Sequence, residues 1–187
     1  MRYRRTWQAG GTYFFTVNLA DRTSRLLVTE VNALRESVRL VKARHPFDIL
    51  AWVVMPDHLH VLWTLPDGDG DNATRWALIK SGFSRHIPPG EQVAASRRRK
   101  GERGIWQRRF WEHLITDETD LSRHFDYVHI NPVKHGHAQR ASDWPYSSIH
   151  RYIHAGWITR DWAAGPQDAA IETGERTDAD EALHRLG

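Results

Sequence analysis

The order of patterns along the 187 residues predicts an α+β fold, a ferredoxin-like split βαβ sandwich with a central antiparallel sheet. Segments rich in β-branched and aromatic residues alternate with segments of helical apolar spacing in the order β-α-β-β-α-β. A Pro-Asp pair joins the second and third strands closely enough for a hairpin, which makes these two strands antiparallel. An additional C-terminal helix follows the fourth strand, and we expect the helices to cover one face of the sheet.

The first half of the chain provides three strands and one helix. The first strand is expected at residues 10–20, where GGTYFFTVNLA follows a Gly-Gly break. A helix is expected at residues 30–44, with Thr29 as its N-cap. Its apolar positions recur at helical spacing: Val31, Leu34, Val38 and Val41. Residues 48–55 and 58–65 are the two strands of the hairpin.

The next helix and the fourth strand are separated by a basic segment. Asp71 or Asn72 is expected to cap a helix. Its buried stripe consists of Trp76, Ile79 and Phe83. Residues 88–104 are polar, basic and contain Gly and Pro, so we expect a mobile loop there. The sequence IWQRRFWEHLI at residues 105–115 predicts the fourth strand.

The additional helix is expected to begin at Asp117 or Thr119 and to continue to about Ile130. Pro132 is expected to stop it, because the residue before a proline is disfavoured in helical geometry. The apolar face of this helix would consist of Leu121, Phe125 and Val128. An aromatic-rich segment at residues 144–158 adds a last element.

Composition excludes several classes of protein. The chain has no cysteine, so disulfides and thiolate metal sites are excluded, and a cytoplasmic location is expected. Its longest apolar run, at residues 49–55, is far too short to span a bilayer, and no membrane association is expected. A hydrophobic content of 40% is typical of a globular protein.

Charge divides the chain into two parts. Residues 168–187 hold six acids and two bases, a net charge of −4. Because the whole chain has a net charge of +3, the remaining residues carry +7. We expect one domain over residues 1–163 and a disordered acidic tail over residues 164–187. The basic excess, mostly arginine near aromatic residues, suits nucleic acid but also fits an ordinary solvated surface. If the partner is DNA, the tail either competes with it for the basic surface or is simply a solvated end.

Two histidines lie at alternate positions directly after the Pro-Asp turn. His58 and His60 belong to one expected strand, so both side chains lie on the same face of the sheet. Leu59, Val61 and Trp63 would then face the opposite way. Two imidazoles at this spacing can share a divalent ion, but a third ligand is required. Without that ligand, two polar strand positions are the better explanation of the pattern.

A second polar group lies on the additional helix. Tyr127 and Asn131 are one turn apart, and His124 shares their face, away from the expected apolar stripe. A solvent-facing tyrosine and an asparagine cap would explain these residues without any chemistry.

The pairing of HLH with a later YVHINPVKHG resembles the HUH single-tyrosine transposases and is most similar to their REP-associated tyrosine transposase branch. The resemblance covers roughly residues 3–162. Further motifs follow in that family's order: YRRTWQAGGTYFFTVNLADR, AWVVMPDHLHVLWTLP, IWQRRFWEHLI and DWPYSSIHRYIHAGW. Several motifs in one order are more specific than His-x-His alone.

The resemblance implies a metal-dependent, sequence-specific single-stranded DNA endonuclease and strand-transferase, in which Tyr127 forms a covalent 5′-phosphotyrosine intermediate. It implies a divalent ion, Mg²⁺ or Mn²⁺, held by His58, His60 and Asn131. Several transposon-borne relatives have glutamine at the position of Asn131, whereas the REP-associated branch is similar in having asparagine. Three residues are candidates for the group that accepts the proton of the tyrosine: His124, Lys134 and His135.

The resemblance also implies single-stranded DNA with a hairpin as the partner, bound by a monomer or a homodimer. The expected phosphate contacts are Arg4, Arg5, Arg97, Arg98, Arg99, Lys100, Arg108 and Arg109. Trp7, Trp106 and Trp111 are candidates for stacking on bases, although a core position explains each of them as well. Two rival functions stay open: a hairpin-binding protein without catalysis, and a replication or conjugation nickase with the same chemistry.

Overall fold

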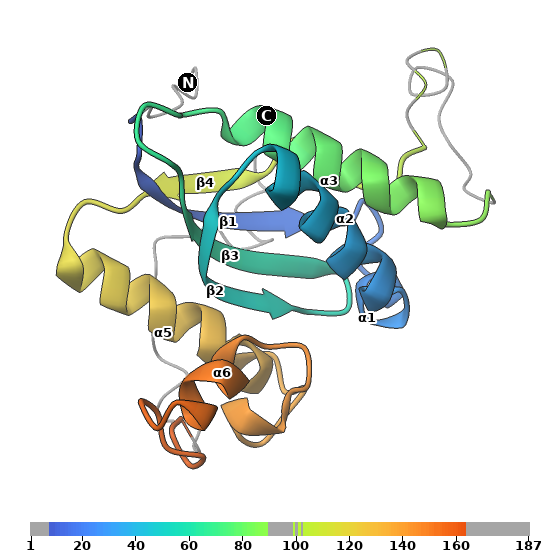
Figure 1. Ribbon diagram of the computed structural model, residues 1–187. Helices are drawn as coiled ribbons and strands as arrows, with labels where there is room; N and C mark the ends of the chain where they lie inside the picture. Colours follow the sequence, from blue (N-terminus) through green and yellow to red (C-terminus); the bar gives the residue numbers. More distant parts are fainter. Residues whose placement is uncertain (1–7, 90–98, 100, 102, 164–187) are drawn as a thin grey trace, which may run out of the picture.

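The computed structural model describes residues 8–89, 99, 101 and 103–163. A four-stranded sheet forms the centre, with helices on both of its faces (Figure 1). The elements are, in chain order, β1 (Thr12–Asn18), α1 (Leu26–Thr29), α2 (Val31–Arg44), β2 (Asp48–Val54), β3 (His58–Thr64), α3 (Asn72–His86), β4 (Trp111–Leu114), α5 (Glu118–Lys134), η1 (Ala141–Asp143) and α6 (Ile149–His154). The predicted β-α-β-β-α-β order and the additional helix are confirmed.

The strand order is β2-β3-β1-β4, and every neighbouring pair is antiparallel. This order places the two long central strands side by side, as a ferredoxin-like sandwich requires. The register pairs Thr16 with His60 and Asn18 with His58. The polar positions of β1 and β3 therefore lie together on one face of the sheet.

The opposite face carries the main apolar core, beneath α2 and α3. Trp63 of β3 stacks on Trp76 of α3 at 4.6 Å between ring centroids, and Phe15 of β1 lies against both rings. The predicted stripe of Trp76, Ile79 and Phe83 is buried, and the Asp71 side chain caps α3 by accepting from the Thr74 amide. The core thus fixes which face of β3 the histidines occupy.

Helices cover both faces of the sheet rather than the single face that we expected. Phe14 alternates with Phe15 along β1, and its ring contacts His124 and Tyr127 of α5. In Figure 1, α5 lies below the sheet, on the side away from α2 and α3. The second face is therefore the one that carries the polar residues.

The edge of β2 is covered by the segment before α6. Val53 forms a bridge with Ser147, and the Val54 amide donates to the Tyr146 carbonyl at 2.9 Å. Ser148 both donates its amide to the Trp52 carbonyl and accepts from the Trp52 amide with its hydroxyl. This segment occupies the hydrogen-bonding groups that an edge strand would leave open.

The expected N-cap at Thr29 is wrong. Thr29 is the last residue of the short helix α1, and its hydroxyl donates to the Arg25 carbonyl at 3.0 Å. The cap position of α2 falls on Glu30, which makes no side-chain cap hydrogen bond. Because α1 runs almost directly into α2, no extended residue is left between them to act as a side-chain cap.

The fourth strand is shorter than expected, because the segment before it bulges. Thr16 pairs with Trp111, and Leu19, just beyond β1, pairs with Trp106. Between these two pairs the chain advances three residues on the β1 side and five residues on the β4 side. The two extra residues must leave the ladder. Arg108 and Arg109 lie at this bulge and are exposed.

The additional helix passes the proline that we expected to stop it. α5 begins at Glu118, where Asp117 accepts from the Asp120 amide, and ends at Lys134. Gly136, with φ of 69°, ends the helix: its amide donates to the Val133 carbonyl, and the next amide donates to the Pro132 carbonyl. This is a Schellman cap, in which a left-handed glycine closes the last turn. Pro132 is tolerated because it removes only one helical donor near the end.

Most of the basic loop and the whole acidic tail lie outside the described residues. Among the residues that are described, no helix combines the length and the apolar character needed to cross a membrane.

Candidate active site

The site begins with the two histidines of β3. His58 and His60 lie on the face of the sheet turned toward α5, with ring centroids 4.9 Å apart. Both side chains are almost fully buried. The alternation of the strand brings them together, as the sequence predicted.

Each histidine is held by a neighbour through its Nδ1 atom. His58 Nδ1 donates to the Asp57 carboxylate at 2.8 Å, and Arg22 pairs with the other carboxylate oxygen at 2.9 Å. His60 Nδ1 shares a hydrogen bond of 2.9 Å with the Thr16 hydroxyl, its partner across the strands. Such contacts fix the orientation of the rings and leave the Nε2 atoms for a ligand.

Burial raises the pKa of the Asp57 carboxyl, but the hydrogen bond and charge of His58 and the Arg22 guanidinium outweigh it, so the pKa falls below its ordinary value. Asp57 is therefore an anion at neutral pH, and it holds His58 in the orientation that exposes Nε2.

The helix α5 presents its polar face to this site. His124, Tyr127 and Asn131 are all buried, so the explanation of a solvent-facing tyrosine and an asparagine cap is wrong. The Tyr127 ring lies 5.2 Å from the His60 ring between centroids, and 5.8 Å from that of Phe14. Leu121 and Phe125, expected to form the inner stripe, are only half-buried. The polar stripe is inward because it meets polar positions on β1 and β3.

Several polar atoms in this site have no hydrogen-bond partner among the described residues. They are His60 Nε2 and both side-chain atoms of Asn131. Burial, followed by the charges of His58 and His135, lowers the pKa of His60 well below its ordinary value. The Asn131 side chain acts in the opposite direction, because it lies close to the His60 ring, although the two side chains do not meet the geometry of a hydrogen bond. His60 is therefore neutral, which is the form that binds a metal.

Buried polar atoms without partners are unfavourable unless a ligand satisfies them. The imidazole nitrogens of His58 and His60 and the amide oxygen of Asn131 are chemically suited to one divalent cation. The residues present thus fit the expected metal.

Two of the three expected assistants lie beside the site. The Lys134 ammonium is 4.9 Å from the centroid of the Tyr127 ring, and the His135 ring is 5.3 Å from that of His58. The third, His124, contacts the Phe14 ring at 4.8 Å and belongs to a different group of residues.

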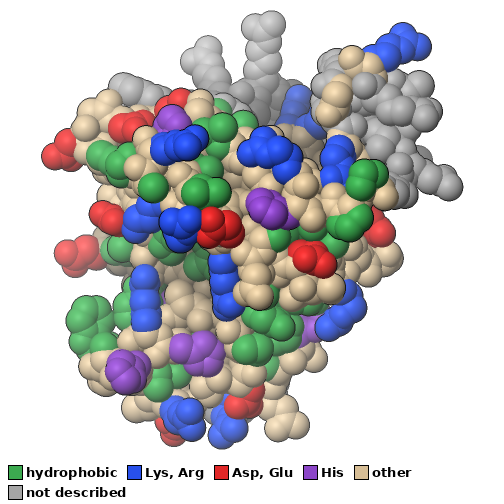
Figure 2. All heavy atoms as spheres, turned by 45° about the vertical axis from the view of Figure 1, so that its right-hand side comes forward, with side chains coloured by type: hydrophobic (Ala, Val, Ile, Leu, Met, Phe, Trp, Pro, Cys, Tyr) green, Lys and Arg blue, Asp and Glu red, His purple; other side chains and the backbone are tan. Residues whose placement is uncertain are grey.

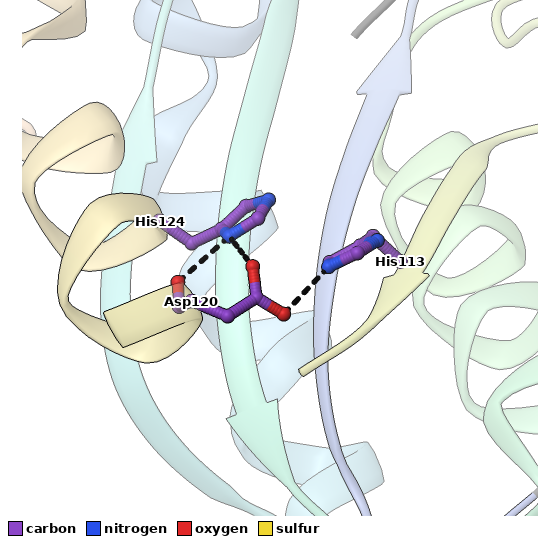
Figure 3. Close-up of side chains that lie close together, drawn as sticks. All are labelled: His113, Asp120 and His124. Carbon is purple, nitrogen blue, oxygen red and sulfur yellow. Dashed lines mark hydrogen bonds and ion pairs between the residues drawn. The ribbon is translucent and has the colours of Figure 1, made fainter. Parts of the chain in front are cut away.

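That group consists of His113 on β4 with Asp120 and His124 on α5 (Figure 3). One potential ligand atom from each lies within 4.8 Å of the others. His113 Nε2 contacts one Asp120 carboxylate oxygen at 2.8 Å, and His124 Nδ1 contacts the other at 3.0 Å. We did not expect this cluster, although WEH before the helix and D-x-x-x-H within it would have indicated it.

The structure places three of the expected DNA contacts, and Arg99, Arg108 and Arg109 are exposed. The other five, Arg4, Arg5, Arg97, Arg98 and Lys100, lie outside the described residues, as does Trp7. Trp106 is buried against Phe83 at 5.3 Å, so the core interpretation holds for it. Trp111 is half-buried and contacts Phe14.

A basic groove of about 400 Å³, which was not expected from the sequence, lies between α2, β2 and residues 146–151. Figure 2 shows Lys and Arg side chains around a hollow on one face of the molecule. The groove is lined by Trp52 and Tyr146 together with Arg35, Arg39, Lys42 and Arg151. Glu36 pairs with Arg39 and Asp48 with Lys42, so its charge is partly compensated. Aromatic rings with positive charge are a composition that suits a nucleic-acid strand.

Known proteins resemble this chain over nearly its whole length. The REP-associated tyrosine transposase of Escherichia coli (strain K12) is 45% identical over 174 residues, which cover 93% of this chain and 96% of that protein. A protein of Haemophilus influenzae described as a putative REP-associated tyrosine transposase is 44% identical, with 88% of this chain and 94% of that protein covered.

Among solved structures, a REP-associated tyrosine transposase bound to a REP hairpin matches 95% of this chain and 98% of its own, with a TM-score of 0.79 and 44% identity. No protein-family model matches the chain. Identity of this level over almost the full length of both chains shows common membership, and this chain belongs to the REP-associated tyrosine transposases.

Proposed function

We propose that the protein is a metal-dependent, sequence-specific single-stranded DNA endonuclease and strand-transferase that acts on hairpin-containing DNA through a 5′-phosphotyrosine at Tyr127. The single observation that carries the proposal is the meeting of the Tyr127 ring with His60, at 5.2 Å, beside His58. A nucleophile next to two imidazoles and a buried amide is an arrangement for phosphoryl transfer rather than for packing.

In the proposed reaction, the Tyr127 oxygen attacks the phosphorus of a phosphodiester. A bond forms between that oxygen and phosphorus, and the bond from phosphorus to the 3′ oxygen breaks. The phenol proton leaves, and the freed strand end takes up a proton to become a 3′-hydroxyl. Because the phosphotyrosine keeps the phosphodiester energy, a second strand end can attack it and rejoin the DNA.

The protein's own groups support each part of this reaction. An ordinary phenol has a pKa near 10, so Tyr127 needs help to react at neutral pH. The Lys134 ammonium lies over the ring at 4.9 Å from its centroid, where it stabilises negative charge on the phenol. The Phe14 ring contacts both Tyr127 and His60 and forms an apolar neighbour to the two side chains.

His58, His60 and Asn131 are the proposed ligands of the divalent ion. Mg²⁺ or Mn²⁺ bound there would neutralise charge on the scissile phosphate and orient it for attack. The support for this ligand set is the group of unpartnered atoms on His60 and Asn131.

The proposed partner is DNA with a hairpin, and the support is the related transposase that was solved with a REP hairpin. Arg99, Arg108 and Arg109 are exposed, and we propose that they contact phosphates. The expected contacts at Arg4, Arg5, Arg97, Arg98 and Lys100 are proposed on the sequence alone.

The test is the formation of a covalent adduct. Labelled single-stranded hairpin DNA is incubated with the protein and Mn²⁺ or Mg²⁺, and adducts that survive denaturation are counted on a gel. We expect the wild type to form the adduct and Tyr127→Phe to bind the DNA without forming it. The double variant His58→Ala/His60→Ala should bind but lose cleavage.

A matched control is Tyr152→Phe, which removes a phenol from α6 and should leave adduct formation unchanged. Circular dichroism verifies that each variant folds. An adduct that persists in Tyr127→Phe would place the nucleophile elsewhere. A wild type that binds the hairpin but never forms an adduct would favour the rival, a binding protein without catalysis.

A further inference from the structure

The cluster of His113, Asp120 and His124 connects β4 to the first turns of the helix that carries Tyr127 (Figure 3). His113 is the only one of the three that comes from the sheet. Its side chain is 34% exposed, whereas those of Asp120 and His124 are 15% and 2% exposed. The contact between strand and helix therefore depends on one accessible histidine.

Both oxygens of the Asp120 carboxylate have polar partners. One oxygen accepts from His113 Nε2 at 2.8 Å and from the Thr116 amide at 3.0 Å. The other lies 3.0 Å from His124 Nδ1, which also contacts the Asp120 carbonyl at 2.9 Å. His124 Nδ1 faces two oxygens and therefore carries a proton, which leaves the lone pair of this ring on Nε2, a buried atom without a hydrogen-bond partner among the described residues. With its protons in place, the group forms a clasp of His113, Asp120 and His124 that joins β4 to α5.

The clasp lies on the same stripe of α5 as the proposed catalytic residues. Asp120, His124, Tyr127 and Asn131 follow one another at intervals of four, three and four residues, which keeps them on one face. Asp120 is at the β4 end of this stripe, and Asn131 is at the end near His60. Phe14 lies between, in contact with both His124 and Tyr127.

Apolar packing alone holds this end of the helix weakly. Leu121 and Phe125 are only half-buried, and Ser122 and Arg123 are exposed. A slip of one residue moves a helix about 1.5 Å along its axis and turns it by about 100°, which would take Tyr127 off the site. A directional contact at the β4 end would oppose such a slip.

We propose that His113 is a positioning residue for cleavage: by holding Asp120, it fixes the axial position and rotation of α5, so that Tyr127 and Asn131 meet His58 and His60. The inference rests on the proposed function and deepens it. His113 touches no reacting atom itself and acts through the helix.

Two substitutions at His113 separate the hydrogen bond from the rest of the side chain. In His113→Gln the amide nitrogen reaches about as far as imidazole Nε2 and can still donate to Asp120. In His113→Asn the amide reaches only as far as Nδ1, so the clasp opens. We expect His113→Gln to cleave within about threefold of the wild type, and His113→Asn to cleave about tenfold more slowly or less. The hairpin dissociation constant should stay the same in both.

A second measurement does not depend on cleavage. Hydrogen exchange of the amides in residues 120–131, followed by mass spectrometry, should be faster in His113→Asn than in His113→Gln or the wild type, because the helix opens more often. If the wild type forms no Tyr127 adduct but exchange is still faster in His113→Asn alone, the proposed function is wrong, whereas the role of His113 in holding α5 is supported.

Three results would overturn the proposal. His113→Asn could cleave and exchange like the wild type, so that the clasp positions nothing. Both variants could lose activity equally, which would make the imidazole ring, rather than its donor, the essential feature. Finally, Zn²⁺ could raise the melting temperature of the wild type but not of His113→Gln, which would make the cluster a metal site.

Discussion

At the scale of single residues, Asn131 is a position at which the proposed metal-binding function would oppose stability in this protein. Its side chain is fully buried, and neither its amide nitrogen nor its oxygen has a hydrogen-bond partner among the described residues. Each such atom is unfavourable by about 1–3 kcal/mol. A ligand in the site would reverse that penalty.

Replacement of Asn131 by leucine, which is similar in shape and apolar, tests this conflict. We expect the free energy of unfolding of the metal-free variant to exceed that of the metal-free wild type by about 1 kcal/mol or more, because the unpartnered atoms are gone. The same variant should bind Mn²⁺ more weakly and cleave DNA more slowly. Thermal unfolding with and without Mn²⁺ measures both effects.

Val128→Leu, on the same helix but outside the proposed ligand set, is the control for overpacking. If Asn131→Leu destabilises the metal-free protein while its Mn²⁺ affinity is retained, Asn131 is a structural residue and not a ligand.

The sequence predicted which residues share a face but not what that face meets. The period of two in HLH brought His58 and His60 together, and the four-residue interval did the same for Tyr127 and Asn131. The holding contacts of Thr16 and Asp57 were not predicted. Thr16 is found only through the register of β1 against β3, which no local pattern specifies.

At the scale of elements, Lys80 of α3 places a half-buried charge against the segment that precedes β4. Its ammonium donates to the Gln107 carbonyl at 3.0 Å and lies over the rings of Trp106 and Phe110. Burial lowers the pKa of Lys80 to about 8 from its ordinary value of 10.5. Helix α3 therefore carries a cation that is less stable in the folded protein than in the unfolded chain.

The sign of the pH dependence follows from this pKa. Between about pH 8 and 10.5 the unfolded chain keeps the Lys80 proton and the folded protein releases it, so the free energy of unfolding rises with pH. Across this pH window we expect the free energy of unfolding of the wild type to rise by up to about 2 kcal/mol relative to that of Lys80→Met, after allowance for solvent screening.

Urea unfolding of both proteins at pH 7 and pH 10.5 measures this difference. Lys42→Met removes an exposed lysine of α2 and should follow the wild type more closely. Parallel pH profiles for the wild type and Lys80→Met would contradict the expectation.

Element boundaries were the weakest part of the prediction, because distant contacts set them. The glycine at 136 ends α5, although Pro132 is the stronger local signal in the sequence. β4 is short because the pairing of Leu19 with Trp106 leaves two residues over, a mismatch visible only once both strands are aligned. Thr29 failed as a cap because an unexpected helix precedes it.

At the scale of the whole molecule, positive charge is the feature that matters for the proposed DNA partner. Outside residues 168–187 the chain carries a net +7. The bulge before β4 presents Arg108 and Arg109 together, so their contribution can be removed with little effect on the core.

Binding of the hairpin should therefore weaken as salt increases. In Arg108→Gln/Arg109→Gln the slope of log affinity against log salt should become shallower by about 1.5–2, as expected for the loss of two phosphate contacts. Fluorescence anisotropy at several salt concentrations measures the slope. Arg140→Gln is the matched control, since Asp143 already pairs with Arg140. An unchanged slope in the double variant would exclude these two arginines from the interface.

The order of elements, and with it the fold, followed from local patterns because six consecutive segments agreed with one topology. The convergence of β3 with α5 did not follow, because it depends on how α5 returns across the sheet. We expected helices on one face only, and that error concealed the burial of Tyr127 and Asn131.

The covered edge of β2 has a consequence for how copies of the chain can associate. Residues 146–148 already occupy the open hydrogen-bonding groups of β2. In the part of the chain that the structure describes, β4 has no further strand beside it. Among the described strands, β4 thus offers the open edge at which a second polypeptide could extend the sheet. That edge is four residues long and lies beside His113, so self-association by strand addition there would be short, weak and adjacent to the clasp.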